Sequence, residues 1–257
     1  MYSADLLSIL LPAFAAGLIV LSTHLILGRQ VLQRNIVFID LAIAQVASLG
    51  VVISHLIMAK VTDINWLYHL LPMGLSLSAS LLIAWLSHHC DDELEAIIGC
   101  FYVLAAASIL LVLANNPHGA EQIERSLAGR IFWLTGTDLI LPACLSLCFL
   151  LLVYFVPQVL CGWLFYPVFA VLVTLSVDLV GVYLVFSTLI MPSLATRHLA
   201  EHQAIKVACV LGTAGYGVGL IIAHELNIPG GAVIVTTLAF FCVLFRIIYG
   251  RLYRAKI

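Results

Sequence analysis

The architecture of this chain is decided by residues 163–191, which read WLFYPVFAVLVTLSVDLVGVYLVFSTLIM. The segment is apolar almost throughout, but it is too long for one comfortable membrane span of roughly 20 residues. The sequence Asp178-Leu179-Val180-Gly181 interrupts it near its middle. An irregular break is tolerated at membrane depth only where protein or water covers the backbone. We therefore expect two short helices that meet at this break.

The composition places the rest of the chain in a membrane as well. Of the 257 residues, 63% are hydrophobic and only 9% are charged, against roughly 25% charged residues in a soluble globular domain. So few charged side chains cannot cover a water-soluble globule of this size, whereas lipid accepts an apolar exterior. A net charge of −2 with 11 Lys and Arg argues against nucleic-acid binding, which needs clustered positive charge.

Seven further apolar stretches have the length of a membrane span. Together with the broken segment they predict an all-α fold, a polytopic transmembrane helical bundle of about eight to nine membrane segments with one broken pair. No linker and no repeat of fixed period divides the chain, so we expect residues 1–257 to form a single transmembrane domain. The seven stretches are Leu6–Leu27, Ile36–Met58, Leu67–Ser87, Ala96–Ala114, Leu139–Val156, Ile205–His224 and Ala232–Tyr249.

Lys and Arg near the span ends predict the orientation, because cytoplasmic loops are enriched in them. Three segments carry most of these residues: the loop Gly28–Asn35, the loop Ser193–Lys206 and the C-terminal end from Arg246 onward. These three segments lie on the same side of the membrane only if residues 163–191 cross the membrane twice. The C-terminus is then cytoplasmic and the N-terminus is outside. The acidic loop His88–Glu93 shares the cytoplasmic side, whereas Arg125 and Arg130 oppose the scheme.

A polar seam follows the second span. Ionisable groups inside a membrane cost several kcal/mol unless they face protein or water, so each one indicates a special position. Asp40, Ala44 and Ala47 lie near one face of this helix, with Gln45 at its edge. One interpretation is a cation path along this face. The alternative is that Asp40 caps the start of the helix and Gln45 forms hydrogen bonds between helices.

Further candidates lie in other spans. His24 is close in depth to Asp40 if the first two spans form a hairpin, and carboxylate oxygen with imidazole nitrogen suits zinc or manganese. A transporter needs such a site to be incomplete, because an ion held by four good ligands would not leave. The alternative for His24 is a bond to a backbone carbonyl of the next helix, and His55 lies close enough to the outer end to be interfacial. The candidate pathway residues are His24, Asp40, Gln45, His55 and Asp178.

Other patterns argue against an enzyme. Ile228 stands where the zinc-protease motif beginning at His224 needs a second histidine, and no G-x-S-x-G elbow occurs. Without a phosphate-binding loop the chain cannot hydrolyse ATP by itself, so energy must come from a partner or an ion gradient.

The seven cysteines do not form a disulfide framework, and we expect them to fill the core. Close helix packing is predicted at Gly212, Gly215 and Gly219.

Three segments resemble signatures of the zinc/manganese-type ABC transporter permeases: Phe38–Gly50, Leu127–Leu139 and Val180–Arg197. The last is the most specific, with Val-Gly, an apolar run, Pro192 and small residues that end in Arg197. The resemblance implies a homodimeric permease of the bacterial inner membrane that imports divalent metal as its substrate. It further implies a cytoplasmic ABC ATPase that uses ATP, and usually an extracytoplasmic metal-binding protein. The chain itself is then a transporter subunit that binds no cofactor.

Two features depart from the family pattern. Many members have Ala-His where this chain has Ala44-Gln45, and Asp40 lies one residue further upstream than the family's aspartate. The family also has a longer cytoplasmic segment, with a helix that docks on the ATPase, where only Pro157–Gly162 remains here. Either another loop, such as Arg197–Lys206 or His88–Glu95, contacts the ATPase, or coupling is altered or lost. We expect the contact at Arg197, His198, Glu201 and Lys206.

Two functions from different classes follow from these observations. The leading hypothesis is an importer of zinc, manganese or a similar divalent ion that works by alternating access. The alternative is a non-transporting membrane scaffold or sensor derived from such a permease, which the shortened segment suggests. The sequence does not choose among zinc, manganese and iron, because selectivity depends on the geometry of the site and on metal availability.

Overall fold

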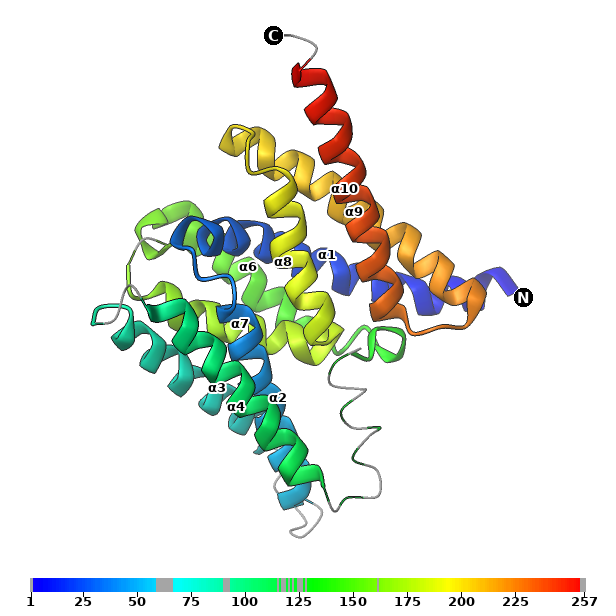
Figure 1. Cartoon of the computed structure of the whole chain (residues 1–257). Helices are drawn as coiled ribbons and strands as arrows, with labels where there is room; N and C mark the ends of the chain where they lie inside the picture. Colours follow the sequence, from blue (N-terminus) through cyan, green and yellow to red (C-terminus); the bar gives the residue numbers. More distant parts are fainter. Residues whose placement is uncertain are drawn as a thin grey trace.

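The computed structural model is all-helical over the residues it describes (Figure 1). These are residues 2–58, 67–89, 93–114, 129–160 and 162–254, together with 116, 119, 121, 123 and 127. The expected polytopic helical fold is confirmed. The elements are α1 (Tyr2–Arg34), α2 (Ile39–Met58), α3 (Leu67–Leu86), α4 (Leu94–Leu113), η2 (Ile131–Trp133), α6 (Ile140–Phe155), η3 (Pro157–Leu160), α7 (Phe165–Val180), α8 (Val182–Ala195), α9 (Glu201–Leu226) and α10 (Gly230–Arg254).

Length and hydropathy identify the helices suited to a membrane. Within the described residues, five helices are long and apolar enough to span it alone, and α7 with α8 forms a sixth, bent unit. Two shorter apolar helices, Leu70–Leu86 and Ile140–Phe155, accompany them. The predicted total of eight to nine segments therefore agrees approximately with the fold. The five long helices are Leu10–Arg34, Ile39–Ile57, Leu94–Leu113, Glu201–Leu226 and Gly230–Tyr249.

The predicted break inside residues 163–191 is confirmed and lies at Gly181. α7 and α8 meet there at a bend of 120°. Gly181 has φ +82° and ψ 163°, a backbone region essentially restricted to glycine. Its N–H donates to the Val177 carbonyl at 2.9 Å, and its carbonyl accepts from the Val185 N–H at 3.1 Å. One glycine thus ends the first short helix and begins the second.

The segments rich in Lys and Arg meet at one end of the bundle, which we call the basic end. Arg29 of α1 and Arg197 after α8 line the same pocket. Arg246 of α10 donates a hydrogen bond to His198 Nε2 at 2.6 Å. α4 begins at this end as well, because Glu95 accepts a hydrogen bond from the Phe38 N–H at 3.4 Å. Part of the acidic loop, residues 90–92, lies outside the described residues, as does Arg125.

The other end, which we call the opposite end, holds the turn at Gly181 and the segment before α6. A Cβ added to Gly129 would clash with the Val180 carbonyl, so the two backbones touch there. Gly230, at the start of α10, lies against Phe132 of η2. α6, α7, α8, α9 and α10 therefore each run from one end to the other in alternating directions.

The helices form two groups that are visible in Figure 1. α1, α8, α9 and α10 pack on one another, and α2, α3, α4 and α7 form the second group. The hydroxyl of Thr174 on α7 donates to Ser76 on α3 at 2.7 Å within the second group. The turn between α1 and α2 and the break between α7 and α8 connect the groups. α6 belongs to neither group, because it contacts both α1 and α7.

Small residues allow close helix contacts, as predicted for α9. A Cβ at Gly219 would lie 2.7 Å from the Ile234 Cα of α10, and one at Gly215 would lie 3.0 Å from the Leu238 Cα. Gly212 packs on Leu21 of α1. The prediction for the cysteines was wrong for four of the five that are described, since these four are exposed on the helix surfaces and only Cys242 is buried.

The expected loop Gly28–Asn35 was also wrong, because α1 continues as helix to Arg34. Gly28 does not break the helix, since its bare backbone packs on the Leu189 carbonyl and Ser193 of α8. The helix ends instead at Asn35, which adopts the left-handed conformation with φ 56°. The Ile36 N–H then donates to the Val31 carbonyl at 3.2 Å. This pattern satisfies the carbonyls that a helix end leaves open.

Candidate functional site

The polar seam of α2 lies in the interior of the bundle. Asp40, Gln45 and Ser48 expose 0%, 5% and 1% of their surface. α2 packs on α3, α4, α7 and α8, which explains why it is enclosed on most sides. Asp40 and Gln45, the two polar residues of the predicted seam, therefore face protein.

Asp40 has an unusual environment for a carboxylate. Neither of its oxygens has a hydrogen-bond partner, although both are buried. It does not cap α2, so the capping alternative for this residue is not supported. Its position in the first turn of α2 places it near the positive end of the helix dipole, which favours an anion. A buried carboxylate without partners costs several kcal/mol, and a cation beside it would offset that cost.

His24 occupies a corresponding buried position on α1. Its side chain is 0% exposed, and its Nδ1 lies 2.9 Å from the Val20 carbonyl, one turn earlier in the same helix. The Nε2 atom is buried without a partner. The expected bond to a carbonyl of the next helix is thus replaced by one within α1. The second nitrogen remains available, because a neutral imidazole has one donor and one acceptor nitrogen.

The structure does not bring His24 and Asp40 together through a helical hairpin. α1 packs along α8 and α9, whereas α2 packs along α3 and α4. His24 shares its face of α1 with Gly17, which contacts Tyr216 of α9, and with Gly28, which contacts α8. In the described part of the chain, no three His, Cys, Asp or Glu side chains are grouped as they would be around a metal ion.

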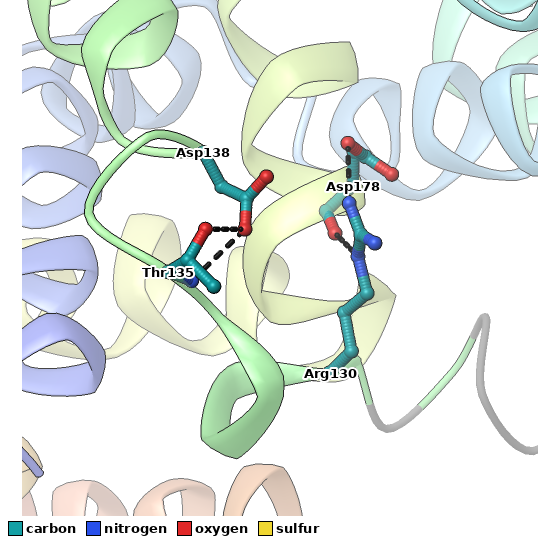
Figure 2. Close-up of polar contacts among 4 residues, drawn as sticks. All are labelled: Arg130, Thr135, Asp138 and Asp178. Carbon is teal, nitrogen blue, oxygen red and sulfur yellow. Dashed lines mark hydrogen bonds and ion pairs between the residues drawn. The ribbon is translucent and has the colours of Figure 1, made fainter. Parts of the chain in front are cut away.

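Asp178 lies at the opposite end and not in the interior (Figure 2). It is half-buried on α7 and pairs with Arg130, whose Nη2 is 3.3 Å from Asp178 Oδ2. Arg130 Nε also donates to the Asp178 backbone carbonyl at 3.4 Å. The side chain from the second family-like segment thus holds the residues directly before the break at Gly181.

A second polar turn lies beside this ion pair. Asp138 Oδ2 accepts from the Thr135 N–H at 2.9 Å and from the Thr135 hydroxyl at 2.7 Å, as Figure 2 shows. These two hydrogen bonds, with a smaller contribution from Arg130, lower the pKa of Asp138 below its ordinary value of 3.8. This turn leads directly into α6. The segment before α6 is therefore held at two points, by the ion pair of Arg130 with Asp178 and by the hydrogen bonds of Thr135 to Asp138.

His55 lies in the last turn of α2, away from the basic end, and is exposed. This position agrees with the interfacial alternative for that residue. Of the five pathway candidates, the structure buries His24, Asp40 and Gln45, and places His55 and Asp178 nearer the surface.

The expected ATPase contacts are accessible at the basic end. Arg197, His198, Glu201 and Lys206 are all exposed, on the turn between α8 and α9 and on the first turns of α9. Arg246 fixes this turn, since its guanidinium donates to His198 Nε2 and to the carbonyls of Leu194 and Ala195. The turn is therefore an exposed surface on a supported base.

The short link between α6 and α7 is packed down on α1. Arg34 donates to the Leu160 carbonyl at 2.8 Å and to the Gly162 carbonyl at 3.4 Å. Its guanidinium also lies over the Phe165 ring, 4.5 Å from the centroid. Val159 and Leu160 are buried. This link does not project from the bundle as a docking helix would.

The sequence interpretation missed the partners of these residues. Arg130 opposed the orientation rule, and an arginine on the side poor in Lys and Arg is itself a signal that a nearby acid pairs with it. Arg34 gave no comparable signal, because its partners are two backbone carbonyls and an aromatic ring more than a hundred residues away.

Comparison with known proteins bears on the whole chain. The ABC 3 transport family matches residues 7–170 and 157–249. Among solved structures, "PsaBC from Streptococcus pneumoniae in complex with Fab" is similar, with 20% sequence identity and a TM-score of 0.72. The match covers 91% of this chain and 89% of that one. At 20% sequence identity, it shows that the two chains share a fold. No curated protein sequence matches the chain.

Proposed function

Because the chain belongs to the ABC 3 transport family, we propose that it imports a divalent metal ion such as zinc or manganese. The chain is the multi-pass membrane subunit of an ABC transporter, and ATP hydrolysis belongs to a partner chain. We further propose that the basic end and the C-terminus are cytoplasmic, since Lys and Arg are enriched on that side. An extracytoplasmic metal-binding protein would then deliver the ion to the opposite end.

Asp40 is the observation that carries the metal assignment. It offers two buried oxygens without hydrogen-bond partners, and carboxylate oxygen is a good ligand for divalent ions. His24 offers an unpartnered nitrogen at the interface of α1 with α8 and α9. An incomplete donor set is suited to transport, because the ion must leave. Because His24 and Asp40 are not brought together here, each would contact the ion separately, with further ligands from Gln45, from water or from a second copy of the chain in a homodimer.

The two helix groups provide a route for alternating access. They are connected at the α1–α2 turn and at Gly181, so a change of angle between them would open one end and close the other. Arg130 and Asp178 hold the opposite end in the arrangement described here. The ATPase would act through Arg197, His198, Glu201 and Lys206, and the absence of crosslinks from this turn in an assembled complex would refute that contact.

Metal uptake in a strain lacking the transporter tests the proposal. The intact gene, expressed with its ATPase, should raise uptake of zinc or manganese over the empty vector. Asp40→Asn should lower uptake about tenfold or more at equal membrane levels, because the amide keeps the shape and loses the charge. Ser54→Ala is the matched control: Ser54 is also buried on α2 but bonds to its own helix at the Val51 carbonyl.

The experiment tests the role of Asp40 and the import function separately. Unchanged uptake in Asp40→Asn would remove Asp40 from the pathway and leave the import function standing. No gain in uptake of any divalent metal with the intact gene would reject import itself.

A non-transporting scaffold or sensor is the second candidate. It is favoured by the α6–α7 link, which is tied to α1 by Arg34 and has no projecting helix in its described residues. The two functions differ in their partners: neighbouring genes for an ATPase and a secreted metal-binding protein, with co-purification of the ATPase, favour the importer.

A further inference from the structure

A pocket at the basic end contains hydrogen-bond donors that have no partner among the described residues. It has a volume of about 270 Å³ and lies between the ends of α1 and α8. Among the described residues, no acidic side chain lines it. The lining residues are Arg29, Leu32, Gln33, Asn35, Ser193 and Arg197.

Two of the lining residues bring polar atoms that are buried and unpaired. Ser193 is 1% exposed, and its Oγ has no hydrogen-bond partner. Arg29 Nε is likewise buried without a partner. In the described residues, neither Arg29 nor Arg197 forms an ion pair with a carboxylate. Buried donors are normally satisfied, so these atoms indicate a missing acceptor.

The two guanidinium groups are not needed to cap the helices beside them. The end of α1 is closed by Asn35 and by the Ile36 N–H, which donates to the Val31 carbonyl. At the end of α8, the Thr196 hydroxyl donates to the Pro192 carbonyl at 2.8 Å. Arg246 donates to the carbonyls of Leu194 and Ala195. A cation is favourable at the C-terminal end of a helix, but other groups already cap both of these helix ends. Helix capping therefore does not explain why Arg29 and Arg197 both lie here.

We propose that this pocket binds a phosphate group, supplied by an anionic phospholipid of the adjacent leaflet or by free phosphate. Guanidinium groups match the geometry of phosphate oxygens, and the Ser193 hydroxyl supplies a third donor. Leu32 gives one wall an apolar character that suits the glycerol backbone of a lipid. Basic pockets between helices at the cytoplasmic face are typical binding places for anionic headgroups. The proposal does not depend on which ion the chain carries.

Lipid binding to the purified full-length protein in phosphatidylcholine nanodiscs tests this site. Native mass spectrometry should show bound phosphatidylglycerol when this lipid is added, and binding about tenfold weaker in Arg29→Gln and in Arg197→Gln. Lys206→Gln is the matched control, because it removes a positive charge from the same end outside the pocket. It should bind phosphatidylglycerol like the wild type.

Ser193→Ala keeps the test decisive if the arginine variants do not fold. Its hydroxyl has no internal partner, so its removal costs no internal hydrogen bond, and it should also weaken binding.

A second arm with sodium phosphate identifies the source of the ligand. If the protein binds phosphatidylglycerol but not inorganic phosphate, the pocket is a lipid site. If it binds inorganic phosphate but not phosphatidylglycerol, the pocket is a free-phosphate site. Wild-type lipid binding in all three pocket variants, or an equal loss in Lys206→Gln, would overturn the proposal. So would loss of ATPase binding in Arg29→Gln without any phosphate or lipid binding, which would assign the pocket to a carboxylate of that partner.

Discussion

Substitution of Gly181 by alanine should destabilise the chain through the backbone alone. At φ +82° and ψ 163°, an alanine is strained by about 1–3 kcal/mol. Relief of that strain would disturb the hydrogen bonds that Gly181 makes to Val177 and Val185. For a chain of this size, this cost corresponds to a fall in Tm of about 3–10 °C. Thermal unfolding in nanodiscs, followed by tryptophan fluorescence, measures it.

Gly136→Ala is the matched control for this prediction. Gly136 lies in the same region, has no positive φ, and a Cβ there meets no atom within 4 Å. Its Tm should stay within about 1 °C of the wild type. If both variants unfolded at the same temperature, the argument that the break depends on a glycine-only backbone would fail.

Three further changes test other contacts. Arg34→Ala should cost about 2 kcal/mol, from a charged hydrogen bond and a cation–π contact, and should make the α6–α7 link more sensitive to protease; a link equally resistant in the variant contradicts this. A double-mutant cycle on Arg130 and Asp178 should give a coupling of only about 0.2–1 kcal/mol, because both side chains are partly exposed; a coupling above that range would show a drier environment. The lowered pKa of Asp138 means that its carboxylate stabilises the fold above the ordinary pKa, and that this contribution is lost as pH falls through the folded value. Unfolding curves of wild type and Asp138→Asn should therefore converge below about pH 4, and a constant gap across pH would contradict the role of the two Thr135 hydrogen bonds.

The sequence predicted the membrane helices well, because their signal is local. Apolar length alone gave Leu139–Val156 for the helix at Ile140–Phe155, and the polar interruption near Gly181 located the break. The end of α1 was missed for a physical reason. Gly28 looks like a helix breaker until α8 is known to press against it, and that contact joins residues far apart in the chain.

The candidate site was predicted in part. Burial of His24, Asp40 and Gln45 followed from the cost of placing polar groups in lipid, which forces them toward protein. Which of these residues share a space did not follow, because helix pairing depends on packing between distant segments. A simple hairpin of the first two spans was the natural expectation, and the packing of α1 on α8 and α9 replaced it. The same limit hid the pairing of Arg130 with Asp178.

The bend at Gly181 has a consequence for the surrounding lipid. At 16 and 14 residues, α7 and α8 are about 24 and 21 Å long, shorter than a hydrocarbon layer of about 30 Å. α9, with 26 residues, is about 39 Å long, so it crosses this layer even with its first exposed turns outside it. The chain thus combines two helices that are shorter than the hydrocarbon layer with one that spans it fully. We therefore expect the bilayer to thin where it meets α7 and α8, so that acyl-chain length affects how well these two helices fit it.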